Sequence, residues 1–170
     1  MEVIAAAAAN LPNGDLMVWS SYSKQDHSQF SGTTWTSLVD PQTMIQKDHF
    51  VQANHDMFCP GTAILPDMRV MVSGGSNANA VTFYDPNSNE WVRGADMVIP
   101  RGYQSMTMLE DGRVFTVGGS WPDGRPGFGN KTGEVWDPRT NLWEKKSGIL
   151  AEKMLTNDKD GGKTSCSPER

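Results

Sequence analysis

Internal repetition is the feature of this sequence that most restricts its fold. Three segments of 11 residues align without a gap, namely Leu11–Ser21, Leu65–Gly75 and Leu109–Gly119, and successive copies begin 54 and 44 residues apart. Each copy contains two apolar stretches joined by a turn of the Asn/Asp-Gly type, and it ends in two small residues. Apolar stretches joined by such turns are typical of β-hairpins.

A second hairpin pattern lies between these copies. The segment Tyr84–Trp91 aligns with Trp136–Trp143, 52 residues later, and Val39–Thr43 is a weaker, earlier copy. Two hairpins in about 50 residues are the period of a kelch-type propeller blade, which has four antiparallel strands. A generic β-sandwich does not predict ungapped copies. The sequence therefore predicts an all-β fold, an incomplete kelch-type β-propeller of about three four-stranded antiparallel blades.

The third blade illustrates the expected strand order. We expect its strands at residues 103–109, 113–117, 133–137 and 142–145. Glycines at 118 and 119 end the second of these strands, and they permit backbone angles and a close approach that a Cβ would forbid. Trp91 and Trp143 are expected to fill the space between neighbouring blades.

The predicted propeller does not close within this sequence. Propellers have roughly 4–8 blades, whereas the repeats account for about three. A further inner strand is expected near Met154–Leu155, with a turn at Asp160–Gly161, but the polar residues that follow have no strand pattern. We expect a partial kelch propeller over residues 1–160 and an unstructured or aberrant tail over 161–170. The sequence is interpreted as a fragment of a larger protein or as an incorrectly terminated gene model.

Composition excludes several classes of function. The chain has 15 Lys and Arg against 20 Asp and Glu, a net charge of −5, so it lacks the basic surface that binds nucleic acid. No apolar run approaches the ~20 residues of a membrane span. The first ten residues lack the basic region of a signal peptide. Two cysteines are too few for a disulfide scaffold, and their spacing matches no zinc site.

Cys59 and Tyr103 occupy equivalent positions in the repeats. Each lies six residues before a copy of the first hairpin, at Leu65 and Leu109, and Ala5 is the equivalent residue of the first blade. Innermost strands crowd around the propeller axis, so the thiol and the phenol are expected to be neighbours. On these grounds alone the pair has a second interpretation, a buried apolar cysteine beside a packing tyrosine with a bonded hydroxyl.

The residues around this pair resemble a known family. The segments His55–Gly61, Arg101–Ser105 and Gly118–Trp121 are similar to those of the copper-radical oxidases, the family of galactose oxidase. The resemblance also includes Met17–Tyr22 and Asp111–Phe115, and it extends from about Val3 to about Asp160. Single kelch motifs occur in unrelated binding proteins, but the Cys, Tyr and Trp in these contexts and this order are specific.

The resemblance implies a role for five residues. Cys59 would be joined through sulfur to the ring of Tyr103, and Tyr103 would also be an equatorial copper ligand. The indole of Trp121 would cover the thioether, which gives the site its three expected catalytic residues. Phe58 and Phe30 would line the substrate pocket. The second tyrosine and the two histidines that complete the family's copper site come from later blades and the C-terminal domain.

The implied chemistry explains these residue types. Family members oxidise primary alcohols to aldehydes and reduce O2 to H2O2, and most are secreted fungal enzymes. The oxidation removes two electrons, whereas a Cu(II)/Cu(I) couple moves one, so a tyrosyl radical supplies the second. The ortho sulfur makes that radical easier to form, and a tetragonal nitrogen and oxygen site suits Cu(II). The expected partners are a small primary alcohol or sugar and O2, with no nucleic acid and no membrane, and the complete protein is expected to be a monomer.

Three histidines, His27, His49 and His55, lie outside the contexts of the family's copper histidines, and we expect surface or capping roles for them. One protein ligand of four then remains, and copper affinity depends on ligand count and geometry. We therefore expect the isolated chain to be inactive. The alternatives are a non-catalytic kelch-repeat binding module and an artefactual reading frame. The alcohol itself is not identified by these residues.

Overall fold

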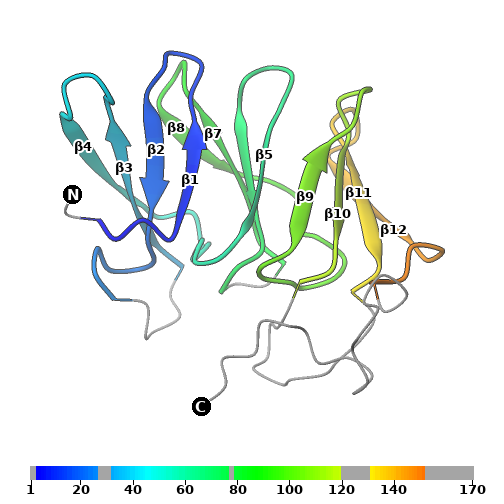
Figure 1. The fold of residues 1–170 in the computed structure, drawn as a ribbon. Helices are drawn as coiled ribbons and strands as arrows, with labels where there is room; N and C mark the ends of the chain where they lie inside the picture. Colours follow the sequence, from blue (N-terminus) through cyan, green and yellow to red (C-terminus); the bar gives the residue numbers. More distant parts are fainter. Residues whose placement is uncertain (1–2, 27–31, 77–78, 120–130, 152–170) are drawn as a thin grey trace.

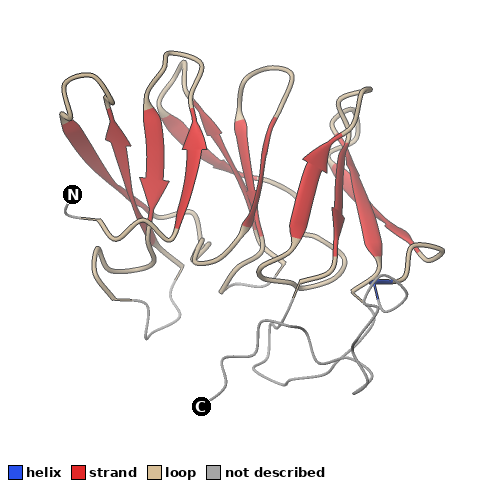
Figure 2. Cartoon of the chain, in the orientation of Figure 1, coloured by secondary structure: helices blue, strands red, loops and turns tan. Residues whose placement is uncertain are grey.

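The fold consists of three β-sheets placed side by side. The structure is a computed structural model that describes residues 3–26, 32–76, 79–119 and 131–151. Within these ranges twelve strands form three four-stranded antiparallel sheets that follow one another in sequence order (Figures 1 and 2). No helix in these ranges is both long and apolar enough to cross a membrane. The expected all-β blade architecture is confirmed.

Each sheet is a simple meander in which every strand pairs with the next in the chain. The first blade contains β1 (Ala7–Asn10), β2 (Leu16–Trp19), β3 (Thr34–Val39) and β4 (Gln46–Val51). The second contains β5 (Gly61–Ile64), β6 (Val70–Ser73), β7 (Val81–Asp85) and β8 (Glu90–Arg93). The third contains β9 (Ser105–Met108), β10 (Val114–Val117), β11 (Gly133–Asp137) and β12 (Leu142–Lys146).

The Asp-Pro hairpins repeat the same hydrogen bonds in blades two and three. The carboxylates of Asp85 and Asp137 accept the backbone N–H groups two residues further on, at 2.8 and 2.9 Å. Asn89 and Asn141 then take left-handed φ angles of 57° and 53°, which asparagine tolerates better than most residues. Their side-chain oxygens accept hydrogen bonds from the aromatic residues that begin the motif, at 2.9 and 3.0 Å. The repeated sequence thus specifies a repeated turn.

The core lies between the blades. In β6 every residue is fully buried, and alternate side chains enter two different clusters, because successive residues of a strand point to opposite faces. The cluster between blades one and two contains Leu11, Met17, Trp19, Val51, Met57, Val70, Val72 and Tyr84. The cluster between blades two and three contains Ala63, Leu65, Met71, Val81, Phe83, Met97, Val114, Trp136 and Trp143.

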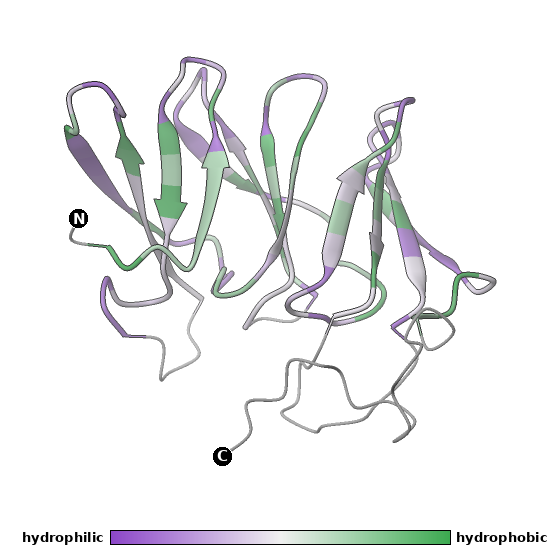
Figure 3. Ribbon diagram, in the orientation of Figure 1, coloured by the Kyte–Doolittle hydropathy of each residue, from purple (hydrophilic) through white to green (hydrophobic). Residues whose placement is uncertain are grey.

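The two predicted inter-blade tryptophans lie at these clusters. Trp91 packs against the cluster between blades one and two. Trp143 is 8% exposed in the other cluster, and its indole N–H donates to the carbonyl of Ala95 at 3.1 Å. The outermost strands β4, β8 and β12 are more hydrophilic than the strands inside them (Figure 3). Both tryptophans therefore fill space between blades, as expected.

Glycine pairs at the ends of β6 and β10 allow the chain to pack closely. Gly74 and Gly119 have φ angles of 66° and 91°. A Cβ on Gly74 would lie 2.0 Å from the carbonyl oxygen of Arg101, and a Cβ on Gly119 would lie 2.5 Å from that of Gly102. Such distances exclude a side chain. The pairs therefore make room for the segment that precedes β9 and carries Tyr103.

Candidate functional site

Cys59 and Tyr103 lie side by side before the innermost strands of adjacent blades. The strands β5 and β9 that follow them pack against each other. The backbone N–H of Tyr103 donates to the carbonyl of Cys59 at 2.9 Å, and the side chain of Tyr103 lies close enough to the thiol to lower its pKa. The structure therefore brings together the sulfur and the phenol that the repeat register places at equivalent positions.

The backbone of both residues is strained in the same way. Cys59 and Tyr103 have φ angles of 57° and 55°, in the left-handed region that costs a residue with a side chain about 1–3 kcal/mol. The third blade's inner strand was expected to include Tyr103, but it begins at Ser105, because this conformation cannot continue a strand. The two equivalent residues thus share one backbone conformation on adjacent blades.

The electrostatics of Cys59 favour a protonated thiol. Burial raises its pKa, the hydrogen bond with Tyr103 opposes this shift, and the nearby Asp56 carboxylate reinforces it. Nucleophilic cysteines instead have a lowered pKa and a positive surrounding. Tyr103 is 44% exposed, so its phenol can be reached from outside the blade. The pair thus differs from a thiolate catalyst, and its tyrosine is partly exposed to solvent.

The segment before Cys59 is fixed by the first blade. The hydroxyl of Ser21 donates to the carboxylate of buried Asp56, with both oxygens at 2.9 Å. The same carboxylate accepts the backbone N–H of Phe58 at 3.2 Å, and the indole of Trp19 donates to the carbonyl of Met57 at 3.0 Å. Phe58, a predicted pocket residue, is half-buried and directly precedes Cys59. These contacts fix the position of the backbone that leads into Cys59.

The expectation of a surface or capping role is wrong for His55. Its side chain is fully buried, with Nε2 2.8 Å from the carbonyl of Gly74 and Nδ1 2.8 Å from the hydroxyl of Thr82. Since a carbonyl only accepts, Nε2 carries the proton and Nδ1 accepts from Thr82. Burial lowers the pKa of His55 to about 4. Both ring nitrogens are occupied, so His55 holds blade two to the segment before Cys59.

This buried histidine predicts acid sensitivity. The unfolded imidazole binds a proton near pH 6.5, but folded His55 does so only near its pKa of about 4. Stability is therefore complete above pH 6.5 and falls as the pH drops towards 4, by up to about 3 kcal/mol. His55→Gln should remove this part of the pH dependence in urea unfolding at pH 7 and pH 5. An identical loss between these pH values in both proteins would contradict the assignment.

Several predicted features lie outside the described residues. These are Phe30, Trp121, His27, the inner strand near Met154–Leu155 with its turn at Asp160–Gly161, and the tail over residues 161–170. Across 3–26, 32–76, 79–119 and 131–151, no three His, Cys, Asp or Glu side chains gather closely enough to hold a metal. Copper in the expected tetragonal field needs several ligands. The described residues therefore do not form a copper site by themselves.

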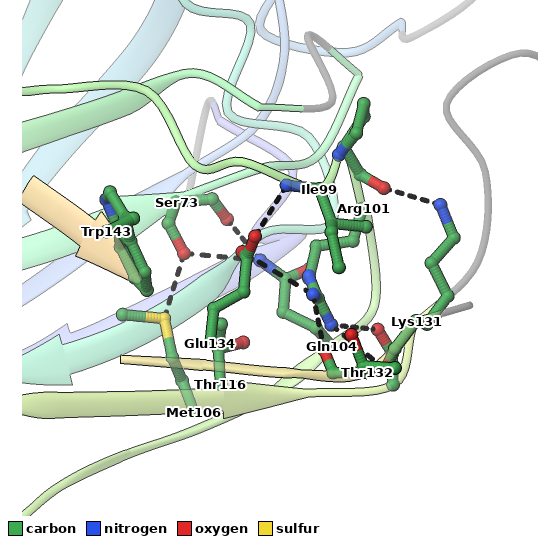
Figure 4. A network of polar contacts seen from close by, with 12 residues as sticks. Ser73, Ile99, Arg101, Gln104, Met106, Thr116, Lys131, Thr132, Glu134 and Trp143 are labelled. Carbon is green, nitrogen blue, oxygen red and sulfur yellow. Dashed lines mark hydrogen bonds and ion pairs between the residues drawn. The ribbon is translucent and has the colours of Figure 1, made fainter. Parts of the chain in front are cut away.

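Sequence reasoning missed a buried ion pair next to Tyr103. Arg101 and Glu134 are both 0% exposed, and their charged groups are 3.4 Å apart (Figure 4). A charged residue inside the apolar strand pattern of residues 133–137 was the one available signal. It did not identify a partner 33 residues away.

Comparison with known proteins gives relatives over most of the chain. Over 161 residues, 94% of the chain, it is 41% identical to a galactose oxidase of Gibberella zeae, and it spans 23% of that protein. It is also 30% identical over 87 residues, 49% of the chain, to an F-box/kelch-repeat protein of Arabidopsis thaliana and covers 24% of it. No family model matches.

A solved structure agrees with this similarity. A fungal alcohol oxidase of the AA5 family, determined in complex with copper, superposes with a TM-score of 0.77 at 38% identity. The match covers 88% of this chain and 32% of that protein. The chain thus spans about a quarter to a third of the length of these oxidases. Homology to galactose oxidase and related copper-containing alcohol oxidases, and the partial kelch propeller, are both confirmed.

Proposed function

We propose that this chain is part of a galactose oxidase-like copper-radical oxidase that converts primary alcohols to aldehydes and reduces O2 to H2O2. The observation that carries this proposal is the contact between Cys59 and Tyr103. The backbone N–H of Tyr103 donates to the carbonyl of Cys59 at 2.9 Å, in a chain homologous to galactose oxidase. In this proposal the oxidase acts on a small alcohol or sugar and is secreted, as the family resemblance suggests.

The two side chains would first become one cofactor. The S–H bond of Cys59 and a ring C–H bond of Tyr103 beside the phenol oxygen break, and a C–S bond forms. The two protons and two electrons released reduce one O2 to H2O2. The raised pKa of the Cys59 thiol means that the sulfur enters this step as a thiol. The attached sulfur then donates electron density to the ring, which makes its one-electron oxidation easier.

The remaining parts of the site are proposed from the resemblance. Tyr103 would bind copper through its exposed phenol oxygen, and Phe58 and Phe30 would contact the substrate. Trp121 would cover the thioether and limit access of solvent. The other copper ligands would come from later blades and the C-terminal domain, as the resemblance implies.

A non-catalytic kelch module is the second candidate. The similarity to an F-box/kelch-repeat protein over 49% of the chain favours it. Such a module needs the hairpins and the inter-blade tryptophans, but it has no use for a thiol and a phenol at the same register. The test of function therefore has to depend on Cys59 and Tyr103.

The test compares the 170-residue chain with a chimera. In this chimera, the 161 matched residues replace their counterparts in the galactose oxidase of Gibberella zeae. With copper and a primary alcohol, we expect no peroxide above background from the chain alone, because the described residues hold no cluster of metal ligands. The chimera should bind copper and produce peroxide. The Tyr103→Phe variant of the chimera should produce no peroxide above background. A fully copper-loaded but inactive chimera would contradict the oxidase assignment, as would an active Tyr103→Phe variant.

A further inference from the structure

The segment that carries Tyr103 is not part of any strand, so its position depends on other contacts. It runs from Ile99 to Gln104 and crosses from blade two to the start of β9. Its central side chain, Arg101, is fully buried and forms an ion pair with the fully buried Glu134 on β11, at 3.4 Å. Figure 4 shows that this pair lies at the centre of a network of polar contacts.

The guanidinium of Arg101 connects the segment to the third blade. Nη1 donates to the carbonyl of Gly118 at 2.9 Å and to that of Lys131 at 3.4 Å. Nη2 donates to the carbonyl of Thr132 at 2.8 Å. These acceptors lie after β10 and before β11. A planar fork of donors bound to three carbonyls has one favourable orientation, so Arg101 fixes where its own backbone lies.

The flanks of the segment are held as well. The carboxylate of Glu134 accepts the backbone N–H of Ile99 at 2.6 Å. The amide of Gln104 donates to the carbonyl of Ser73 at 2.7 Å, and the N–H of Gly75 donates to the carbonyl of Arg101 at 3.0 Å. The residues on both sides of Tyr103 are therefore fixed, one side to β11 and the other to β6.

The charges of the pair are costly to bury. Burial lowers the pKa of Arg101 and raises that of Glu134, and the attraction between the two opposes each shift. A buried ion pair is weak support for stability, since apolar residues of similar size often do as well. Its defined geometry is the more useful property. Here that geometry acts on the residue two positions before Tyr103.

We propose that Arg101 and Glu134 are positioning residues that hold Tyr103 in its left-handed conformation against the sulfur of Cys59. The use of this contact in a thioether rests on the proposed function, whereas the positioning itself does not. Arg101→Lys keeps a positive charge, but its single ammonium nitrogen cannot occupy both the Nη1 and the Nη2 positions, so the segment should move. Glu134→Gln keeps an oxygen for the Ile99 N–H and removes the negative charge, so it should have a smaller effect.

A disulfide can measure this positioning without copper or alcohol. In the full chain, Tyr103→Cys places a second thiol next to Cys59, and Cys166→Ser removes the remaining cysteine. The effective concentration of the two thiols is then measured in glutathione buffers. Only variants that circular dichroism shows to be folded in these buffers are compared. We expect Arg101→Lys to lower it by about tenfold or more, since small displacements of reacting groups are costly.

Arg113→Lys is the matched control. Arg113 is an ion-paired arginine of the same blade, 2.7 Å from Asp111, but it lies in a surface turn and should leave the effective concentration unchanged. If Arg101→Lys does not fold, Glu134→Gln decides the question. If the effective concentration of the two thiols equals that of the control in every folded variant, the proposal is overturned. If Arg101→Lys lowers the effective concentration but the chimera is inactive, the result counts against the oxidase function alone. If the chimera is active but Arg101→Lys leaves the effective concentration unchanged, the result counts against the positioning role alone.

Discussion

Cys59→Ala in the chimera is expected to lower peroxide formation by about 10–100-fold, the usual cost of removing a group that tunes a metal ligand. The sulfur would no longer donate electron density to the ring of Tyr103, so the ring would be harder to oxidise. The fold should be spared, because Cys59 is only half-buried and Ala5 occupies the equivalent position of the first blade. Peroxide production and copper content are measured together.

Arg113→Lys is the control for this experiment, because it changes a surface ion pair of the third blade, 2.7 Å from Asp111, and not the Cys59–Tyr103 contact. It should leave both readings unchanged. Full copper content with low peroxide formation in Cys59→Ala would support a role in tuning the ring. Unchanged peroxide formation in Cys59→Ala would contradict the proposed cofactor, even if the chimera is an active oxidase.

Gly74→Ala is expected to destabilise the chain by about 4 kcal/mol, a value reserved for severe steric conflict, whereas Gly118→Ala should cost about 1 kcal/mol. The two glycines are equivalent in blades two and three and have similar φ angles of 66° and 72°. A Cβ at Gly74 would meet the carbonyl of Arg101 at 2.0 Å, whereas one at Gly118 meets no described atom within 4 Å.

The difference between these two variants isolates one contact. Both substitutions place alanine in the left-handed region, so the cost of that backbone conformation cancels between them. The remaining difference in the free energy of unfolding reports how closely blade two packs on the segment before β9. Urea unfolding of the full chain measures both free energies. Equal losses for the two variants would contradict the inter-blade packing described above.

The blades could be predicted from the sequence because their determinants are local. Turn residues such as Asp85 and Asn89 act within a few positions, and the hydrophobic pattern places each strand. The equivalence of Cys59 and Tyr103 followed from the repeat register alone. Their left-handed backbone did not, because neither residue type favours that conformation and only the surrounding contacts impose it.

The buried polar residues could not be predicted, because their partners are distant in the chain. His55 was expected at the surface, but it is enclosed by Thr82 and Gly74 of the second blade. Glu134 is unusual only as a charge inside an apolar strand pattern, and this does not identify Arg101. Only the packing of β11 beside the Tyr103 segment pairs the two residues. Burial of this kind is a property of neighbouring blades rather than of any one segment.

The most direct test of the central claim is mass spectrometry of the chimera after exposure to copper and air. A peptide that joins Cys59 to Tyr103, two hydrogens lighter than its separate parts and resistant to reduction by thiols, is the result that the proposed cofactor predicts. Cys59→Ala should abolish this peptide. A copper-loaded, peroxide-producing chimera in which Cys59 remains a free, alkylatable thiol would contradict the claim.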